Sequence, residues 1–91
     1  MEFMQLEMFV AVVEEGTVRS ASRKVFRSQP ALSMAVRKLE QELDITLFTG
    51  SSGHRTLTEP GEVFYMYAKR MLELRQESLR AVREMRGTLS E

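Results

Sequence analysis

The chain has 91 residues, enough for one small domain with a modest core, and its 43% apolar and 29% charged residues are ordinary for a globular protein. It contains no cysteine, which excludes a disulfide framework, a thiolate metal site and a thiol nucleophile. No apolar run approaches the ~20 residues of a membrane span, and the start lacks the basic-then-apolar order of a secretion signal. We therefore expect a cytoplasmic protein that does not enter a membrane.

The 13 basic and 13 acidic residues cancel, but they are unevenly placed. Six basic residues and no acidic one lie between Arg19 and Lys38, whereas residues 2 to 15 carry four glutamates and no basic residue. A local positive surface can attract a polyanion, because charges more than a Debye length away, about 8 Å at physiological salt, are largely screened. Taken alone, such a charge run is more typical of solvated helix faces. The helix predicted at the end of this basic segment, over residues 28 to 43, makes DNA binding the favoured interpretation.

Two helices are predicted before residue 28. The first runs from about Phe3 to Glu14, with Gly16 at the position of a left-handed cap. Its apolar stripe consists of Leu6, Phe9, Val10 and Val13. The second runs from a cap at Thr17 to about Phe26. Its small buried side consists of Val18, Ala21, Ser22 and Val25. The short gap before the next helix predicts the tight connection of a helix-turn-helix.

Residues 28 to 43 are predicted to form a helix suited to contact DNA. Ser28 is a typical cap, and Pro30 lies in the first turn, where a missing N–H costs nothing. Asp44 can adopt the left-handed conformation that ends the helix. The apolar stripe consists of Leu32, Val36, Leu39 and Leu43. Polar and basic side chains remain on other faces, namely Gln29, Ser33, Arg37 and Lys38.

A hairpin is predicted after this helix. The β-prone stretch Ile45–Thr49 leads through the loop Gly50–Gly53 to a return strand, His54–Thr58. Strand alternation places Arg55 on the same face as Leu57, which leaves two alternatives: Arg55 is partly buried, or the register of the hairpin slips. The hairpin is expected to stand beside the preceding helix as a wing.

A long helix completes the chain. Thr58 caps it, it continues to about Arg86, and Gly87 is expected to end it. Lys69 and Glu73 have the spacing of an exposed ion pair. The apolar row is longer than the first three helices can cover, which predicts a partner helix. The residues expected to serve dimerisation are Phe64, Tyr67, Ala68, Met71, Leu74, Ser78, Val82 and Met85. We expect residues 1–58 to form a head and residues 59–91 a linker and dimerisation helix, within one structural unit.

Taken together, five segments resemble the amino-terminal part of LysR-type transcriptional regulators. The segments are Phe9–Thr17, Ser28–Ser33, Val36–Glu40, Leu47–Phe48 and Leu57–Gly61. The resemblance covers nearly the whole chain. It implies a mainly α fold, with a three-helix winged helix-turn-helix head, a small two-stranded wing and a long linker helix that pairs antiparallel with that of a second subunit. It also implies that a full-length regulator continues into a periplasmic-binding-protein-like effector domain, which is absent here.

The resemblance also implies roles for single residues. Gln29 matches the family position that reaches base edges, and Pro30 matches one that contacts a thymine methyl, as major-groove chemistry allows. Ser28 and Ser33 would bind phosphate or cap the helix, and Arg37 would bind backbone phosphate. The complete expected DNA-binding set is Thr17, Arg19, Arg27, Ser28, Gln29, Pro30, Ser33, Met34, Arg37, Lys38, His54 and Arg55.

Four positions depart from the family pattern. Met34 stands where a basic or polar residue is usual, Arg27 replaces a small apolar residue, and Asp44 replaces a frequent glycine. Gly50 takes the place of a common arginine, which leaves His54 and Arg55 as the candidates for minor-groove contact. We therefore expect an unusual base preference.

The main hypothesis is a homodimeric transcriptional regulator that binds double-stranded DNA at an inverted-repeat site. The alternative is a protein interaction module with little specific DNA affinity, which Met34 and Gly50 favour. An enzyme is the least favoured class, because one loop histidine and no cysteine do not form a catalytic set. We expect no cofactor, no metal and no small-molecule ligand in this part of the chain. Of the seven methionines, Met8, Met66, Met71 and Met85 are interpreted as adaptable packing residues.

Overall fold

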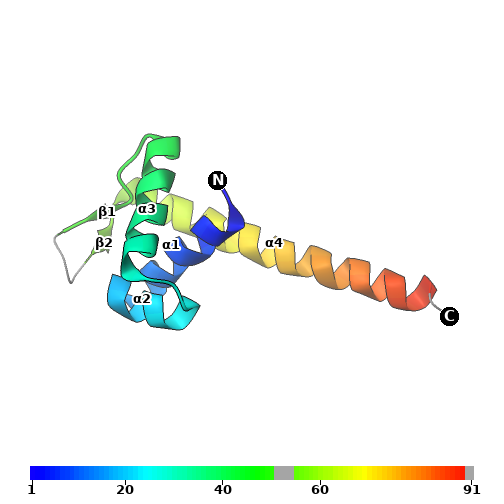
Figure 1. Ribbon diagram of the computed structural model, residues 1–91. Coiled ribbons are helices and arrows are strands. Elements are labelled where there is room, and N and C mark those ends of the chain that lie inside the picture. Colours follow the sequence, from blue (N-terminus) through cyan, green and yellow to red (C-terminus); the bar gives the residue numbers. More distant parts are fainter. Residues whose placement is uncertain (51–54, 90–91) are drawn as a thin grey trace.

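Three helices, a short hairpin and one long helix follow one another along the chain. They are α1 (Phe3–Glu15), α2 (Val18–Val25), α3 (Gln29–Leu43), β1 (Phe48–Thr49), β2 (Thr56–Leu57) and α4 (Glu59–Leu89). The computed structural model describes residues 1–50 and 55–89. The first three helices and the hairpin form a head from which α4 projects, so the molecule measures 56 × 25 × 18 Å (Figure 1). The predicted class, a mainly helical winged helix-turn-helix with a long last helix, is confirmed.

The N-terminal ends of three helices follow the cap chemistry of the sequence. The hydroxyl oxygens of Thr17, Ser28 and Thr58 each accept a hydrogen bond from the backbone N–H three residues later, at 3.1, 3.2 and 3.0 Å. Each bond satisfies an N–H group that has no partner inside its helix. All three predicted caps are therefore formed.

The first three helices each end at a residue in the left-handed conformation. Gly16 ends α1 with φ 84°, and Asp44 ends α3 with φ 55°, both as predicted. Phe26 ends α2 with φ 56°, and its side chain is 91% exposed. This left-handed residue turns the chain sharply, which is why α3 begins so soon after α2.

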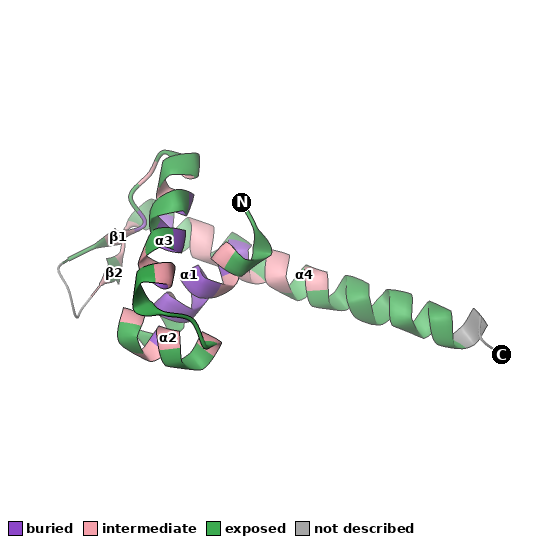
Figure 2. Ribbon diagram, in the orientation of Figure 1, coloured by how far each residue is buried: buried purple, intermediate pink, exposed green. Residues whose placement is uncertain are grey.

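The core of the head is built around α1. Phe9 is fully buried, and its ring centre lies 5.6 Å from that of Phe48 in the hairpin and 5.4 Å from that of Phe64 in α4. A second cluster joins α1 to α2 and α3 and consists of Met8, Ala11, Val12, Ala21, Leu32 and Ala35. In Figure 2 the buried residues accordingly concentrate on α1 and on the side of α3 that faces it. Two faces of α1 therefore hold the other elements in place.

The hairpin is shorter than predicted. β1 pairs antiparallel with β2, with Phe48 opposite Leu57. The preceding segment does not continue the strand, because the Leu47 N–H bonds to a side chain of α3 instead of completing a pair with Thr58 across the hairpin. The Leu47 N–H donates to the Glu40 carboxylate at 2.8 Å, and the Leu47 carbonyl accepts from the Thr58 N–H at 3.0 Å. Residues 45–47 therefore form a connection that ties α3 to the start of α4.

The last helix is longer than predicted, because α4 passes through Gly87 and reaches Leu89. Glycine ends a helix when it adopts a positive φ, and among the described residues the glycines with positive φ are Gly16 and Gly50. Inside a right-handed helix a glycine lowers helix stability by only about 1 kcal/mol relative to alanine. A penalty of this size does not interrupt the helix. Within residues 1–50 and 55–89, no helix combines the length and the apolarity that crossing a membrane requires.

The first half of α4 belongs to the core of the head. Ala68 is fully buried there, so the prediction that Ala68 contacts a partner helix is wrong. Phe64 and Met71, also predicted to serve dimerisation, pack against the same core. The head thus covers more of α4 than the sequence indicated. From residue 76 to residue 87 every residue is exposed (Figure 2).

Candidate nucleic-acid interface

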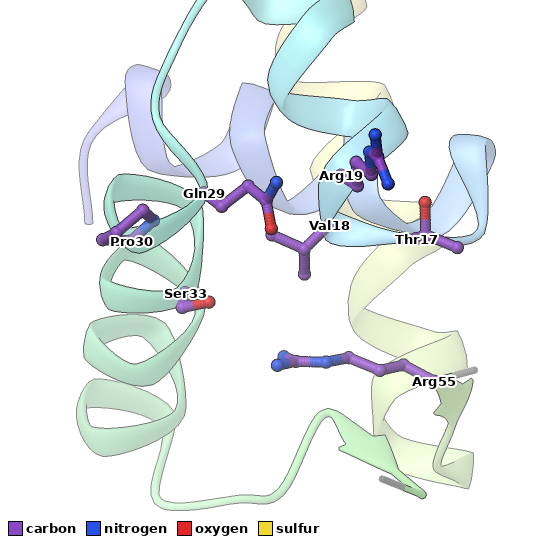
Figure 3. A pocket seen from close by; sticks show the side chains of 7 residues that line it. All are labelled: Thr17, Val18, Arg19, Gln29, Pro30, Ser33 and Arg55. Carbon is purple, nitrogen blue, oxygen red and sulfur yellow. The ribbon is translucent and has the colours of Figure 1, made fainter. Parts of the chain in front are cut away.

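A pocket of about 700 Å³ lies between the first turns of α2 and α3 and the residue that precedes β2 in the wing. Its lining residues, drawn in Figure 3, are Thr17, Val18, Arg19, Gln29, Pro30, Ser33 and Arg55. All but Val18 are among the predicted DNA-binding residues. Val18 was predicted only as part of the buried side of α2, and the spacing of apolar residues gives no sign that it also borders a pocket. Three separate segments of the chain therefore meet at one site.

The caps explain why polar groups gather in this pocket. Thr17 and Ser28 begin α2 and α3 at its edge, so the first turns of both helices border it. Amide groups in a first turn lack carbonyl partners within the helix, and the helix dipole makes this end positive. Both helices therefore favour a negatively charged ligand here.

The packing of α3 fixes where its outer side chains lie. Leu32 and Leu39 are fully buried against the head, whereas Gln29 and Pro30 in the first turn of α3 are exposed. Figure 3 shows the Gln29 side chain extending over the pocket near Val18. A helix held by its apolar face presents its polar face in a fixed orientation, as base contact requires.

Arg55 reaches the pocket from the wing. Its side chain is half-buried, which is the first of the two predicted alternatives, and its guanidinium extends into the pocket toward α3 (Figure 3). Arg55 and Arg19 both line the pocket, and among the described residues neither has an ion-pair partner. Lys24 differs, because its ammonium lies 3.5 Å from the Glu15 carboxylate and 3.8 Å from that of Glu14. The two arginines therefore keep their positive charge free for a ligand.

The remaining predicted residues lie outside this pocket. Met34 and Lys38 line a smaller hollow of about 260 Å³ between α3 and the start of α1. Arg37 is exposed further along α3, where it lines a third hollow with Glu40 and Asp44. These three residues therefore lie in hollows of their own along α3.

Two predicted residues, Arg27 and Ser28, sit in the turn before α3. Arg27 is exposed in the turn. The Ser28 hydroxyl accepts the Ala31 N–H, so of its two expected roles the structure places it in the cap. His54 lies outside the described residues.

The site has the functional groups that the major groove of DNA requires. A carboxamide such as that of Gln29 can pair with both the donor and the acceptor of adenine, and an apolar surface such as Pro30 can contact the methyl group of thymine. Hydroxyl and guanidinium groups, such as those of Ser33 and Arg19, can contact phosphate, and phosphate contacts set the register of a protein on DNA. A helix exposed along one side also fits the width of the major groove.

Residues 3–62 match the family described as bacterial regulatory helix-turn-helix protein, lysR family. The chain belongs to this family. Similar members include the probable RuBisCO transcriptional regulator of Cyanidioschyzon merolae, 42% identical over 81 residues, which are 89% of this chain. Another is the HTH-type transcriptional regulator TfdS of Cupriavidus pinatubonensis, 44% identical over 79 residues, or 87% of this chain. The matched regions are 27% of each relative, so this LysR-family chain spans about a quarter of their length.

Solved structures of the family have the same architecture. The crystal structure of the CbnR DNA-binding domain with DNA matches with a TM-score of 0.89 and 35% identity, over 93% of this chain and 98% of that one. The complex of the BenM DNA-binding domain with benA site 1 DNA matches with a TM-score of 0.88 and 35% identity, over 93% and 96%. The crystal structure of CbnR, a LysR family transcriptional regulator, matches with a TM-score of 0.86 and 36% identity, over 91% of this chain and 29% of that one. The resemblance inferred from the motifs is thereby confirmed.

Proposed function

We propose that this chain is the DNA-binding part of a LysR-type transcriptional regulator and that it binds an inverted-repeat site in double-stranded DNA as a homodimer. The observation that carries the proposal is the pocket in which Arg19, Gln29, Pro30 and Arg55 meet at the start of an exposed helix. Family membership and the two DNA complexes among the similar structures support it.

Within this proposal the residues divide by task. Gln29 and Pro30 contact base edges and choose the sequence, with Met34 one turn further along α3. Phosphate contacts come from Arg19 at the pocket and from the other predicted residues around it, namely Thr17, Arg27, Ser33, Arg37 and Lys38. Arg55 of the wing contacts the minor groove. Residues 1–58 act as the reading head, and residues 59–91 act as the linker and dimerisation helix.

The role is one of binding rather than catalysis, because the family consists of transcriptional regulators. A protein of this kind works where the chromosome is, so we place it in the bacterial cytoplasm at the nucleoid. No cofactor is required for the contacts described, since all of them use groups of the chain itself.

Selection from a randomised duplex pool tests this function, because such a pool contains every candidate half-site. Enrichment of an interrupted inverted repeat is the expected result, because a two-fold symmetric dimer reads two equal half-sites. A pool with no enriched sequence would overturn the proposal.

Salt dependence separates the proposal from its rival, a protein interaction module with little specific DNA affinity. Each phosphate neutralised by the protein releases counterion, so the logarithm of the binding constant should fall steeply with the logarithm of the salt concentration. A flat response, measured by fluorescence anisotropy on the enriched duplex, would favour the interaction module.

A further inference from the structure

Met34 lies near the middle of the outward face of α3. The buried residues of this helix centre on one side of it, and they are Leu32, Ala35, Val36 and Leu39. At 100° per residue, Pro30, Met34 and Arg37 all lie within about 30° of the opposite side. A groove that receives the exposed side of α3 therefore meets these three residues first.

Met34 differs chemically from most of the outward face. Apart from the small ring of Pro30, it is the one exposed hydrophobic side chain of α3, a helix that the structure describes in full, and its exposed fraction is 48%. Its sulfur is only a weak hydrogen-bond acceptor, and the side chain carries no donor and no charge. Met34 is therefore unsuited to contact phosphate or to pair with the polar edge of a base.

A hollow beside Met34 widens this apolar surface. The hollow has a volume of about 260 Å³ and lies between α3 and the start of α1. Besides Met34, its lining consists of the apolar residues Met4, Met8, Ala31 and Ala35 and the polar residues Glu2, Gln5 and Lys38. A small apolar group held against Met34 would therefore have further apolar neighbours close by.

The major groove offers one apolar group to such a surface. Every base pair presents hydrogen-bond donors and acceptors there, and thymine alone adds a methyl group, at C5. A methionine placed against donors and acceptors would shield them from water without pairing them, which weakens binding. Placed against the methyl group, the same side chain removes apolar surface from water, which strengthens binding.

We infer that Met34 reads the C5 methyl group of a pyrimidine, so that each half-site carries thymine or 5-methylcytosine at the position that Met34 faces. The inference rests on the proposed DNA binding and names a base feature that this binding requires. Met34 lies four residues after Pro30, about 6 Å along α3, whereas neighbouring base pairs are about 3.4 Å apart. The two side chains can therefore contact different base pairs.

The shared methyl group has a consequence for modified DNA. A cytosine at the position of Met34 lacks the recognised group, and methylation at C5 adds it in the place where thymine carries it. Methylation of such a cytosine should therefore raise the affinity of the site.

Parallel pool selections with the wild-type chain and with Met34→Ala locate the contact. In the Met34→Ala pool the preference for thymine should disappear at one position of each half-site and remain at the others. Met66→Ala is the matched control, because Met66 is 62% exposed on α4, outside the head, and its pool should equal that of the wild-type chain. Identical preferences in the wild-type and Met34→Ala pools would overturn the inference.

Four duplexes then test the methyl group itself. At the located position they carry thymine or uracil opposite adenine, and cytosine or 5-methylcytosine opposite guanine, with one half-site changed at a time. The wild-type chain should bind the methylated base of each pair about fourfold more tightly, as expected for one buried methyl group, measured by fluorescence anisotropy. Met34→Ala should bring both ratios close to one, whereas Met34→Leu should keep them, because leucine is apolar and of similar volume.

The outcomes separate this inference from the proposed function. Equal affinity of the wild-type chain for the two members of either pair would overturn the inference, and so would ratios that Met34→Ala leaves unchanged. An enriched inverted repeat would keep the proposed function in both cases. A wild-type pool with no enriched sequence would overturn the inference together with the proposed function.

Discussion

The hydroxyl of Tyr65 in α4 donates a hydrogen bond of 2.9 Å to the carboxylate of Glu14 near the end of α1. The Lys69 ammonium donates to the same oxygen, also at 2.9 Å, so one carboxylate holds two successive turns of α4. These bonds lower the pKa of Glu14 below its usual value, mainly through Lys69 and then through Tyr65. The polar contact adds to the apolar packing that joins the long helix to the head.

Replacing this carboxylate should make stability less dependent on pH. Because the pKa of Glu14 is lower in the folded state, the native protein binds fewer protons than the unfolded chain, and Glu14 stabilises the fold above its ordinary pKa of 4.5. This contribution is lost as the pH falls through the folded-state pKa. We expect Glu14→Gln to lower Tm by about 2 to 5 °C at pH 7, and by less as the pH falls below 4.5.

Thermal unfolding followed by circular dichroism at a series of pH values measures this difference. Glu15→Gln is the matched control, because among the described residues the carboxylate of Glu15 forms an ion pair with Lys24 alone, at 3.5 Å, and should matter less. A Tm difference for Glu14→Gln that is the same at pH 7 and pH 4 would contradict the prediction.

A methyl group at Gly61 should disturb the junction between the wing and α4. A Cβ at Gly61 would collide with the backbone carbonyl oxygen of Leu47 and would lie 3.0 Å from the Thr58 hydroxyl. Since the carbonyl belongs to a held backbone segment, we expect Gly61→Ala to cost about 1 to 3 kcal/mol of unfolding free energy in urea titrations. Gly87→Ala is the control, because no atom lies within 4 Å of that position, and it should be neutral or stabilise by up to about 1 kcal/mol. Equal effects at the two positions would argue against the close contact.

Removing the amide of Gln29 should reduce specificity rather than general affinity. We expect Gln29→Ala to cost about 1 to 3 kcal/mol on the selected site and little on random duplex, because a base contact is lost while phosphate contacts remain. Competition titrations with both duplexes measure the two affinities. If neither affinity nor sequence preference changes, α3 does not read DNA through this residue.

Arg37 should act on all sequences alike. We expect Arg37→Ala to weaken binding equally on specific and random DNA and to reduce the salt slope by about 1, because one phosphate contact is lost. Arg83→Ala is a suitable control, since Arg83 is exposed on the projecting part of α4 away from the head. A selective loss on the cognate site alone would assign Arg37 to base contact instead.

Local chemistry made the helices of the head predictable. Ser28 and Thr17 have side chains that bond to a helix start, and Gly16 and Asp44 tolerate positive φ, so the ends of α1, α2 and α3 agree with the prediction to within one or two residues. The predicted end at Gly87 was wrong because a glycine ends a helix only when other contacts hold it at positive φ, which the residue type does not reveal.

Long-range contacts were not predictable from spacing alone. Lys69 was expected to pair with Glu73 four residues away, whereas it bonds Glu14, 55 residues away in the chain. Periodicity likewise marks apolar positions without showing which face the head covers, so Ala68 was grouped with the exposed Leu74. Most pocket residues were predictable because they lie at positions of the family motifs that are associated with DNA contact. Val18 was missed as a pocket residue because its apolar side chain fits the pattern of an ordinary core residue.

Helix α4 runs without a break from the buried Ala68 to the exposed residues 76–87, so the number of residues between them sets how the exposed part is rotated relative to the head. One residue inserted between Ala68 and Leu74 would rotate this exposed part by about 100° and move it about 1.5 Å relative to the head. A two-residue deletion would rotate it by about 200°, whereas an insertion of seven residues would nearly restore the phase and lengthen the helix by about 10 Å. Evolution of this segment is therefore expected to tolerate substitutions far better than changes in length.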